Sequence, residues 1–286
     1  RRGLVDDLEK MKRLTFMTLF TTYWEASSLE LLFKPGFTPS YLPTEGRYSL
    51  IPPAFSTATF TEMDTHTLSA YEIGSRYRIS KGKLDTGLLY FNGYYPDPGF
   101  SITSLAPLSL DLIYTRYQLF GLESSLFFEP FTLAFEGGFF LSEDRSGSDS
   151  ALFNNKLAYL AELSYTHPST SAFVALAYQG RYVFDFSTNA SDIDVLSSYD
   201  GKAYENTLIF VVEYPLIQQK LTLRGALTYQ MESEGYAFLL GLSYALEDNL
   251  QVFGKATFYG ALGTKSSLYK SWDDNDVVMV GLQAWF

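Results

Sequence analysis

Few residues of this sequence have the types and spacing that catalysis requires. The chain contains two histidines, His66 and His167, and no cysteine. His66 follows Asp64 by two residues, and a histidine beside a serine or an aspartate is the arrangement that activates a nucleophile in hydrolases. No motif supplies the serine, so we interpret His66 as a solvated loop residue and His167, which precedes Pro168, as part of a turn. We expect no catalytic residues and no enzymatic activity.

The acidic segment 272–276, with the sequence WDDND, is the one candidate for binding a metal ion. Its carboxylates and amide could offer oxygen ligands to Ca²⁺, but the glycine and distal glutamate of an EF-hand loop are absent. The chain also lacks a glycine-rich phosphate loop, an HExxH motif and a dinucleotide-binding fingerprint. We therefore interpret 272–276 as a solvated acidic loop and expect neither a metal nor a cofactor.

A larger set of charged residues alternates with apolar neighbours along short segments. Successive side chains of a strand point to opposite sides of a sheet, so this spacing places the charges on one face and the apolar residues on the other. We predict that the charged face is the inside of a barrel. The predicted inward residues are Glu30, Glu72, Arg76, Arg78, Asp85, Glu136, Glu162, Arg181, Glu205, Glu213, Arg224 and Lys255.

Charged rings inside a barrel can select ions or solutes. Mixed charges can also pair with one another and fill the lumen, and this structural alternative stays open for each residue. The leading candidate is the pair Arg76 and Arg78, which lie two residues apart on one face. The predicted lumen and solute contacts are Glu72, Arg76, Arg78, Glu136, Glu162, Arg181, Arg224 and Lys255.

The elements that would carry these charges are strands of about ten residues with period-two alternation. The clearest is 221–231. In the long segment 108–128 the alternation loses its phase around 116–118, where we expect a β-bulge. The connections alternate between short and long, with only 232–235 as an exception. The thirteen predicted strands lie near 14–24, 27–34, 68–79, 83–94, 108–128, 131–141, 155–166, 172–186, 204–215, 219–231, 236–246, 250–259 and 277–286.

The composition favours a membrane environment for these strands. The chain has 22 Tyr, 24 Phe and 21 Gly and only 19% charged residues. No apolar run reaches the roughly 18 residues that a membrane helix needs, which excludes a helical membrane protein. The net charge of −11 argues against a nucleic-acid partner. We predict an all-β fold, a transmembrane antiparallel up-and-down β-barrel, with outer-membrane lipid and lipopolysaccharide as its surroundings.

The last predicted strand resembles the assembly signal at the end of outer-membrane barrels, which implies the barrel assembly machinery as a partner. Its residues Val278, Val280, Leu282, Ala284 and Phe286 share one face. If Phe286 ends in the periplasm, an odd count of thirteen strands places the segment 1–13 outside the cell. Bacterial barrels have even strand numbers, so we expect 14 or more strands in the complete protein and at least one before Arg1, with a miscounted strand as the alternative.

We treat 1–286 as a single barrel domain with two special segments. Leu4, Leu8 and Met11 recur at helical spacing, so 1–13 is predicted as a short helical or loop segment. The segment 35–67 is too long for a hairpin loop and contains five prolines and several aromatic residues. We expect it to be an ordered extracellular loop, or one folded into the lumen, where it would narrow a pore.

The run 29–43, LELLFKPGFTPSYLP, with GRYS at 46–49 and YEIG at 71–74, resembles a family of uncharacterised outer-membrane β-barrel, porin-like proteins of Gram-negative bacteria. The resemblance implies an envelope barrel that serves export or uptake of hydrophobic compounds, and an envelope transport complex is a further candidate partner. In that family more strands precede this region. We therefore expect an outer-membrane channel or transporter for small solutes or hydrophobic compounds. The alternative is a non-conducting barrel that anchors an envelope complex or presents surface loops.

Overall fold

The computed structural model describes residues 16–40, 58–65, 67–187, 189, 192–198, 201–265 and 267–285. Its main element is a thirteen-stranded sheet. Each strand of this sheet pairs with the strand of the same sheet that comes next along the chain, and the three strands left out of this order form a second sheet. These strands are β1 (Thr18–Trp24), β2 (Ser27–Lys34), β4 (Glu72–Lys81), β5 (Leu84–Tyr94), β8 (Arg116–Phe128), β9 (Phe131–Ser142), β10 (Lys156–Thr166), β11 (Phe173–Val183), β12 (Tyr204–Leu216), β13 (Leu221–Gln230), β14 (Gly235–Glu247), β15 (Leu250–Ala261) and β16 (Val277–Ala284).

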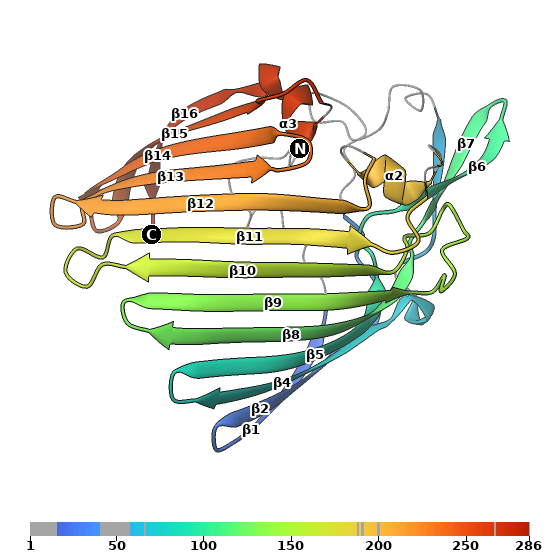
Figure 1. Ribbon diagram of the computed structural model, residues 1–286, viewed down its shortest axis with the longest axis horizontal. Helices are drawn as coiled ribbons and strands as arrows, with labels where there is room; N and C mark the ends of the chain where they lie inside the picture. The colour runs from blue at the N-terminus through green and yellow to red at the C-terminus, as the bar shows by residue number, and fades with distance from the viewer. Residues whose placement is uncertain are drawn as a thin grey trace.

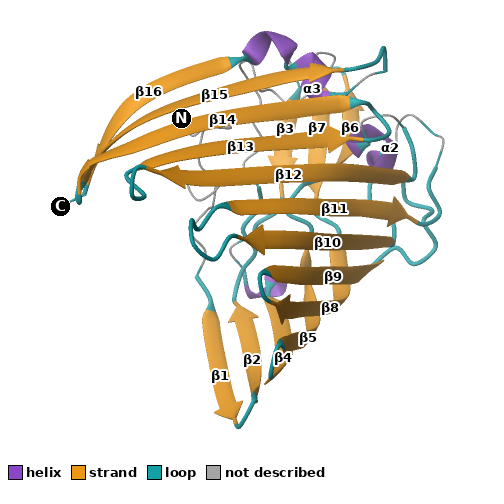
Figure 2. Cartoon of the chain, turned by 60° about the vertical axis from the view of Figure 1, so that its left-hand side comes forward, coloured by secondary structure: helices purple, strands orange, loops and turns teal. Residues whose placement is uncertain are grey.

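All neighbouring strands of this sheet pair antiparallel, which is the up-and-down topology predicted from the alternation. The sheet curves into an arc, with β1 at one edge and β16 at the other (Figures 1 and 2). The pairing order does not join β1 to β16, so the arc is open between these strands. The prediction of an all-β fold of barrel topology is confirmed, with thirteen strands in the described sheet.

A second, three-stranded sheet corrects the prediction of one long strand over 108–128. It consists of β3 (Thr59–Glu62), β6 (Gly99–Leu105) and β7 (Leu108–Ile113), in the order β3-β7-β6. The loss of phase near 116–118 is therefore no β-bulge, because one strand ends at Ile113 and another begins at Arg116. Thr115 between them is fully buried, and its carbonyl oxygen accepts a hydrogen bond from the Tyr95 amide at 2.9 Å.

Two other predicted boundaries also differ. The strand predicted from Leu68 begins at Glu72, because Leu68–Ala70 forms the 3₁₀ helix η2. The long connections are partly ordered, since β3 lies within 35–67 and β6 within the predicted loop 95–107. Phe37 packs edge-on against Tyr114, with ring centroids 5.0 Å apart, so the described part of 35–67 folds back onto other connections.

The connections confirm the predicted alternation of length. Short hairpins join the strands at one end of the sheet, including the β4–β5 turn, where Gly82 has a φ of 64° that favours glycine. The opposite end carries α2 (Ile193–Ser197), α3 (Leu268–Ser271), the 3₁₀ helix η3 (Asp273–Asn275) and the small sheet (Figure 1). No helix in the described part of the chain is long and apolar enough to span a membrane. The tight β13–β14 turn is the predicted exception, and Lys265 Nζ donates to the Glu232 carbonyl oxygen across it at 2.8 Å.

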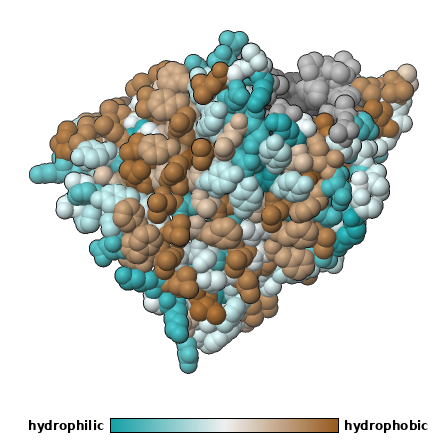
Figure 3. All heavy atoms as spheres, viewed as in Figure 1, coloured by the Kyte–Doolittle hydropathy of each residue, from teal (hydrophilic) through white to brown (hydrophobic). Residues whose placement is uncertain are grey.

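Large apolar side chains are exposed on one face of the sheet. Leu88 in β5 is 58% exposed, Leu176 in β11 is 51% exposed and Val280 in β16 is 77% exposed. Figure 3 shows apolar residues spread over the face of the sheet that is turned toward the viewer. The buried apolar clusters lie among the long connections instead, around Phe37 and Tyr95. The sheet therefore lacks a protein layer over its apolar face in the described structure.

Several predictions fall wholly or partly on residues that the structure does not describe. The segment 1–13, residues 41–57 of the predicted loop 35–67, His66 and Phe286 lie outside the described residues. The other members of the predicted assembly signal, Val278, Val280, Leu282 and Ala284, lie at alternate positions of β16. Val278 and Leu282 are 76% and 70% exposed, so they belong to the apolar face of the sheet. Their role in assembly stays a prediction.

Candidate functional site

The register of the thirteen-stranded sheet defines a charged face. Antiparallel partners point to the same side, so the face can be followed from strand to strand through the paired residues. All twelve predicted inward residues fall on this face. Sequence reasoning missed Lys34, Glu123 and Lys156, of which Glu123 was hidden by the loss of phase before it. The remaining ionisable residues of the sheet, Lys81, Arg116 and Glu247, lie at strand ends.

The predicted pair Arg76 and Arg78 is bound to one carboxylate. Arg76 donates from Nε and Nη2 to Glu123 Oε1 at 2.9 and 2.6 Å, and its Nη1 lies 3.7 Å from Glu30 Oε2. Arg78 Nε lies 3.5 Å from the same Glu123 oxygen. This network of mutually compensated charges joins β2, β4 and β8 in the part of the charged face nearer to the β1 edge. For these residues the geometry agrees with the structural alternative.

Other charges of the face are also paired. Arg224 Nε donates to Glu213 Oε2 at 2.9 Å, and Lys34 forms an ion pair with Glu72. Five charges of the face differ, because no oppositely charged side chain among the described residues lies within ion-pair distance of them: Asp85, Glu136, Lys156, Glu162 and Lys255. These charges are therefore available to water or a solute on the charged face.

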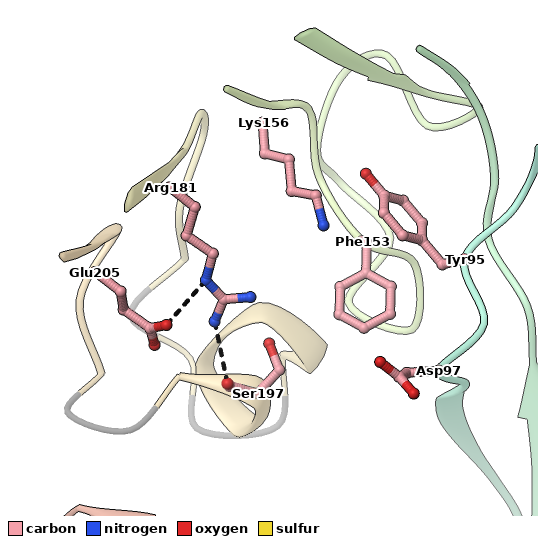
Figure 4. A pocket seen from close by; sticks show the side chains of 7 residues that line it. All are labelled: Tyr95, Asp97, Phe153, Lys156, Arg181, Ser197 and Glu205. Carbon is pink, nitrogen blue, oxygen red and sulfur yellow. Dashed lines mark hydrogen bonds and ion pairs between the residues drawn. The ribbon is translucent and has the colours of Figure 1, made fainter. Parts of the chain in front are cut away.

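A pocket of about 320 Å³ lies at the end of the sheet that carries the long connections. Its lining comes from segments far apart in the sequence, including the first turn after β5, the start of β10, the end of β11 and α2 (Figure 4). Of the predicted solute contacts, the structure brings Arg181 to this pocket. The lining residues are Tyr95, Asp97, Phe153, Lys156, Arg181, Ser197 and Glu205.

Arg181 is held in place by two acceptors. Its Nε lies 3.0 Å from Glu205 Oε2, and its Nη2 donates to the Ser197 carbonyl oxygen at 3.1 Å. Arg181 and Glu205 are direct partners in the β11–β12 register, so the sheet itself aligns the ion pair. The bond to Ser197 ties the C-terminal end of α2 to the charged face. The guanidinium is thus fixed in one orientation at the pocket wall (Figure 4).

Lys156 and Tyr95 form the opposite wall. Lys156 Nζ lies 4.1 Å from the centre of the Tyr95 ring and 4.8 Å from that of Phe140, which are cation–π distances. Tyr95 is 5% exposed and stacks on Tyr117 with ring centroids 4.4 Å apart. Burial raises the pKa of the Tyr95 hydroxyl, so the hydroxyl is neutral and can donate a hydrogen bond. No described group forms a hydrogen bond with it.

Below the pocket, α2 is joined to the β9–β10 connection. Asp192 caps the helix by accepting from the Asp194 amide at 3.0 Å, and Asp194 Oδ2 accepts from the Asn154 amide at 2.9 Å. The Ile193 amide donates to the Ser150 carbonyl oxygen at 2.9 Å. Burial raises the pKa of Asp194, and the neighbouring Asp192 adds to this effect. These bonds hold α2 against Phe153 and Lys156.

His167 and the acidic segment 272–276 lie in connections between strands, where their side chains bind backbone amides. His167 Nδ1 accepts from the Ser169 and Thr170 amides at 3.2 Å, which confirms its interpretation as a turn residue. Asp276 Oδ1 accepts from the Tyr259 amide at 3.0 Å and so fixes the end of the β15–β16 connection. Within the described residues, no group of three His, Cys, Asp or Glu residues could hold a metal ion.

Comparisons with known proteins found no matching family model and no matching curated protein. Solved structures similar to the chain include a mutant of Rhodopseudomonas blastica porin, at 11% identity over 94% of this chain and 77% of the porin, with a TM-score of 0.47. A second porin structure covers 91% of this chain and 80% of its own, at 13% identity and a TM-score of 0.49. The Ralstonia pickettii toluene transporter covers 94% and 81%, at 12% identity and a TM-score of 0.33. All three scores are below 0.5, so the fold is assigned from this chain's own strand pairing.

Proposed function

We propose that the chain forms an outer-membrane channel for small solutes. The observation that supports this is the sorting of side chains, since the ionisable residues of the large sheet lie on one face except at strand ends. A lysine or arginine on a lipid-facing strand costs about 2–4 kcal/mol at the bilayer midplane. A soluble antiparallel sheet can sort its side chains in the same way, but it covers its apolar face with another layer, and the described structure has no such layer. The apolar face is therefore suited to lipid, and the charged face to an aqueous lumen.

The proposal requires both edges of the sheet to be paired in the membrane. The edge strands β1 and β16 each have one described neighbour, so half of their backbone groups lack a strand partner in the described structure. Hydrocarbon offers no water to these groups, and open sheet edges do not occur in it. Closure of the barrel would enclose the charged face as a lumen, with lipid and lipopolysaccharide outside.

The conducting path would run past the charges that lack an ion-pair partner. Glu136 and Glu162 face the interior with no described cation within ion-pair distance, whereas the Arg76–Glu123 network is compensated. Carboxylates on a pore wall favour cations. We expect purified protein in planar bilayers to give stepwise conductance, and a Glu136→Gln/Glu162→Gln variant to shift the reversal potential in a salt gradient toward anions.

A matched control makes the same total charge change outside the strands of the large sheet. The variant Asp273→Asn/Asp274→Asn removes two exposed carboxylates of η3, in the β15–β16 connection at the rim, and should shift the reversal potential less than the Glu136→Gln/Glu162→Gln variant. Absence of conductance in correctly folded protein would contradict the channel. It would favour the alternative, a non-conducting barrel that anchors an envelope complex or presents surface loops.

A further inference from the structure

The pocket beside α2 combines two cationic side chains and an unpaired donor in one enclosed space. Figure 4 shows the Lys156 ammonium and one terminal nitrogen of Arg181 directed toward the space between them, and the Tyr95 ring lies 4.1 Å from the Lys156 ammonium. The ion-pair network around Glu123 lies on other strands and does not use these groups. The pocket is therefore a separate feature of the charged face.

Lys156 is the first indication of a ligand. Its ammonium contacts two aromatic rings, and no described carboxylate or carbonyl oxygen lies within hydrogen-bond or ion-pair distance of it. Removing an ammonium from water is costly unless an anion or acceptor compensates it. Arg181 adds repulsion between like charges, and the carboxylates Asp194, Asp97 and Glu205 offset part of it by weaker attraction from beyond ion-pair distance. An anion between the two cations would remove both penalties.

Tyr95 is the second, independent indication. Its side chain is 5% exposed, lines the pocket and ends in a hydroxyl that has no partner among the described groups. Buried hydroxyl groups in native structures normally have a hydrogen-bond partner. Tyr117 and Phe153, with centroids 4.4 and 5.1 Å from that of Tyr95, fix the ring so that its hydroxyl cannot turn away.

The remaining polar groups of the lining bear on whether the ligand is an anion or a cation. Glu205 is bound to Arg181, and the nearby Asp194 is bound to the Asn154 amide. Asp97 is exposed and lies near Phe153, away from the Lys156 ammonium (Figure 4). Arg181 on one wall and Lys156 with the neutral Tyr95 hydroxyl on the opposite wall thus face the pocket from two sides, and Phe153 with the Tyr95 ring presents an apolar surface.

We propose that this pocket binds a small carboxylate with an aromatic or apolar body. The carboxylate would accept hydrogen bonds from Lys156, Arg181 and the Tyr95 hydroxyl, and the body would lie against Phe153. A volume of about 320 Å³ lies at the lower end of the range for small-molecule pockets. The inference goes beyond the channel, because binding at this mouth of the charged face does not require conduction.

Isothermal titration calorimetry of the purified full chain in detergent micelles tests the proposal with sodium benzoate as the probe. We expect saturable binding of benzoate and at least about tenfold weaker binding of benzamide, which has the same ring without the charge. Benzylamine tests the opposite sign and is expected not to bind. Conductance in bilayers is measured separately, so failure of either proposal can be recognised without the other.

Two variants assign the binding to named groups. Lys156→Met keeps an unbranched side chain against the rings and removes the charge, so benzoate affinity should fall about tenfold or more. Tyr95→Phe removes one hydroxyl and should weaken binding by about threefold to tenfold. The control is Lys81→Met, because Lys81 is exposed at the end of β4 beside the short β4–β5 hairpin and does not line the pocket.

Some results would overturn the proposal. They are benzoate binding that Lys156→Met leaves unchanged, equal affinity for benzoate and benzamide, tighter binding of benzylamine, or no saturable binding of benzoate up to the millimolar range. Far-UV circular dichroism of each variant verifies that the strands are intact. If Lys156→Met does not fold, Tyr95→Phe and the comparison of benzoate with benzamide still decide the question.

Discussion

The protonation of Asp194 makes the stability of α2, beside the pocket, depend on pH. Its carboxylate lies between the Asn154 amide and the caps of α2, where burial raises its pKa and the cations Lys156 and Arg181 lower it in part. The folded protein therefore keeps this proton at pH values where the unfolded chain, with a pKa of about 3.9, has lost it. The stabilisation is present below the unfolded pKa and is lost as pH rises through the folded pKa.

We predict that the free energy of local opening of α2 decreases from pH 4 upward in the wild type. The variant Asp194→Asn retains an acceptor for the Asn154 amide and lacks the titrating proton, so its opening energy should change less over the same range. Hydrogen exchange of the amides in 192–198, corrected for intrinsic rates, measures this difference. Equal pH dependence in the two proteins would contradict the assignment.

At the scale of single residues, the sequence indicates only the part of the site that lies on strands. Arg181 could be predicted because period-two alternation places it opposite the apolar residues of its own strand. Tyr95 and Asp97 could not, because they follow β5 and meet Phe153 and Ser197 through contacts between distant segments. No local pattern records such contacts. The buried hydroxyl of Tyr95 becomes evident only when its surroundings are known.

At the scale of elements, the alternation predicts the strands well and their ends less well. The thirteen expected segments each contain one strand of the large sheet, because lipid on one side and polar groups on the other impose a strict period of two. The prediction of a single strand over 108–128 was wrong. In the sequence, a shift in the phase of the apolar–polar alternation looks the same whether a β-bulge or a break between two strands causes it. Tertiary pairing of β7 with β3 and β6 decides between them.

The two faces of β16 allow a direct comparison within one strand. Val280 lies in the middle of β16 on the apolar face, and Gln283 lies on the charged face opposite Gln251. In phospholipid vesicles we expect Val280→Lys to lower the free energy of unfolding by about 2–4 kcal/mol. Gln283→Lys places the same charge on the charged face and should cost less. Denaturant titrations of both variants measure the difference, and equal losses would argue against a lipid-facing Val280.

At the scale of the whole molecule, the fold is an arc whose two faces have opposite chemistry. The apolar face is exposed over the whole sheet, while the few buried clusters lie among the long connections at one end. A water-soluble sheet of this size would need another layer over its apolar face to bury it. Lipid supplies that layer in the proposed channel, and the long connections then surround the mouth that contains the pocket.

The absence of cysteine makes the orientation of each residue measurable, because any introduced cysteine is unique. In β13 the register places Arg224 on the charged face with Glu213, and Leu223 on the apolar face with Tyr214. Single cysteines along Leu221–Gln230, in protein reconstituted into vesicles, can be labelled with a membrane-impermeant maleimide. We expect rapid labelling at positions 222, 224, 226, 228 and 230 and protection at 221, 223, 225, 227 and 229. Labelling without this period of two would contradict a sheet that separates lipid from water.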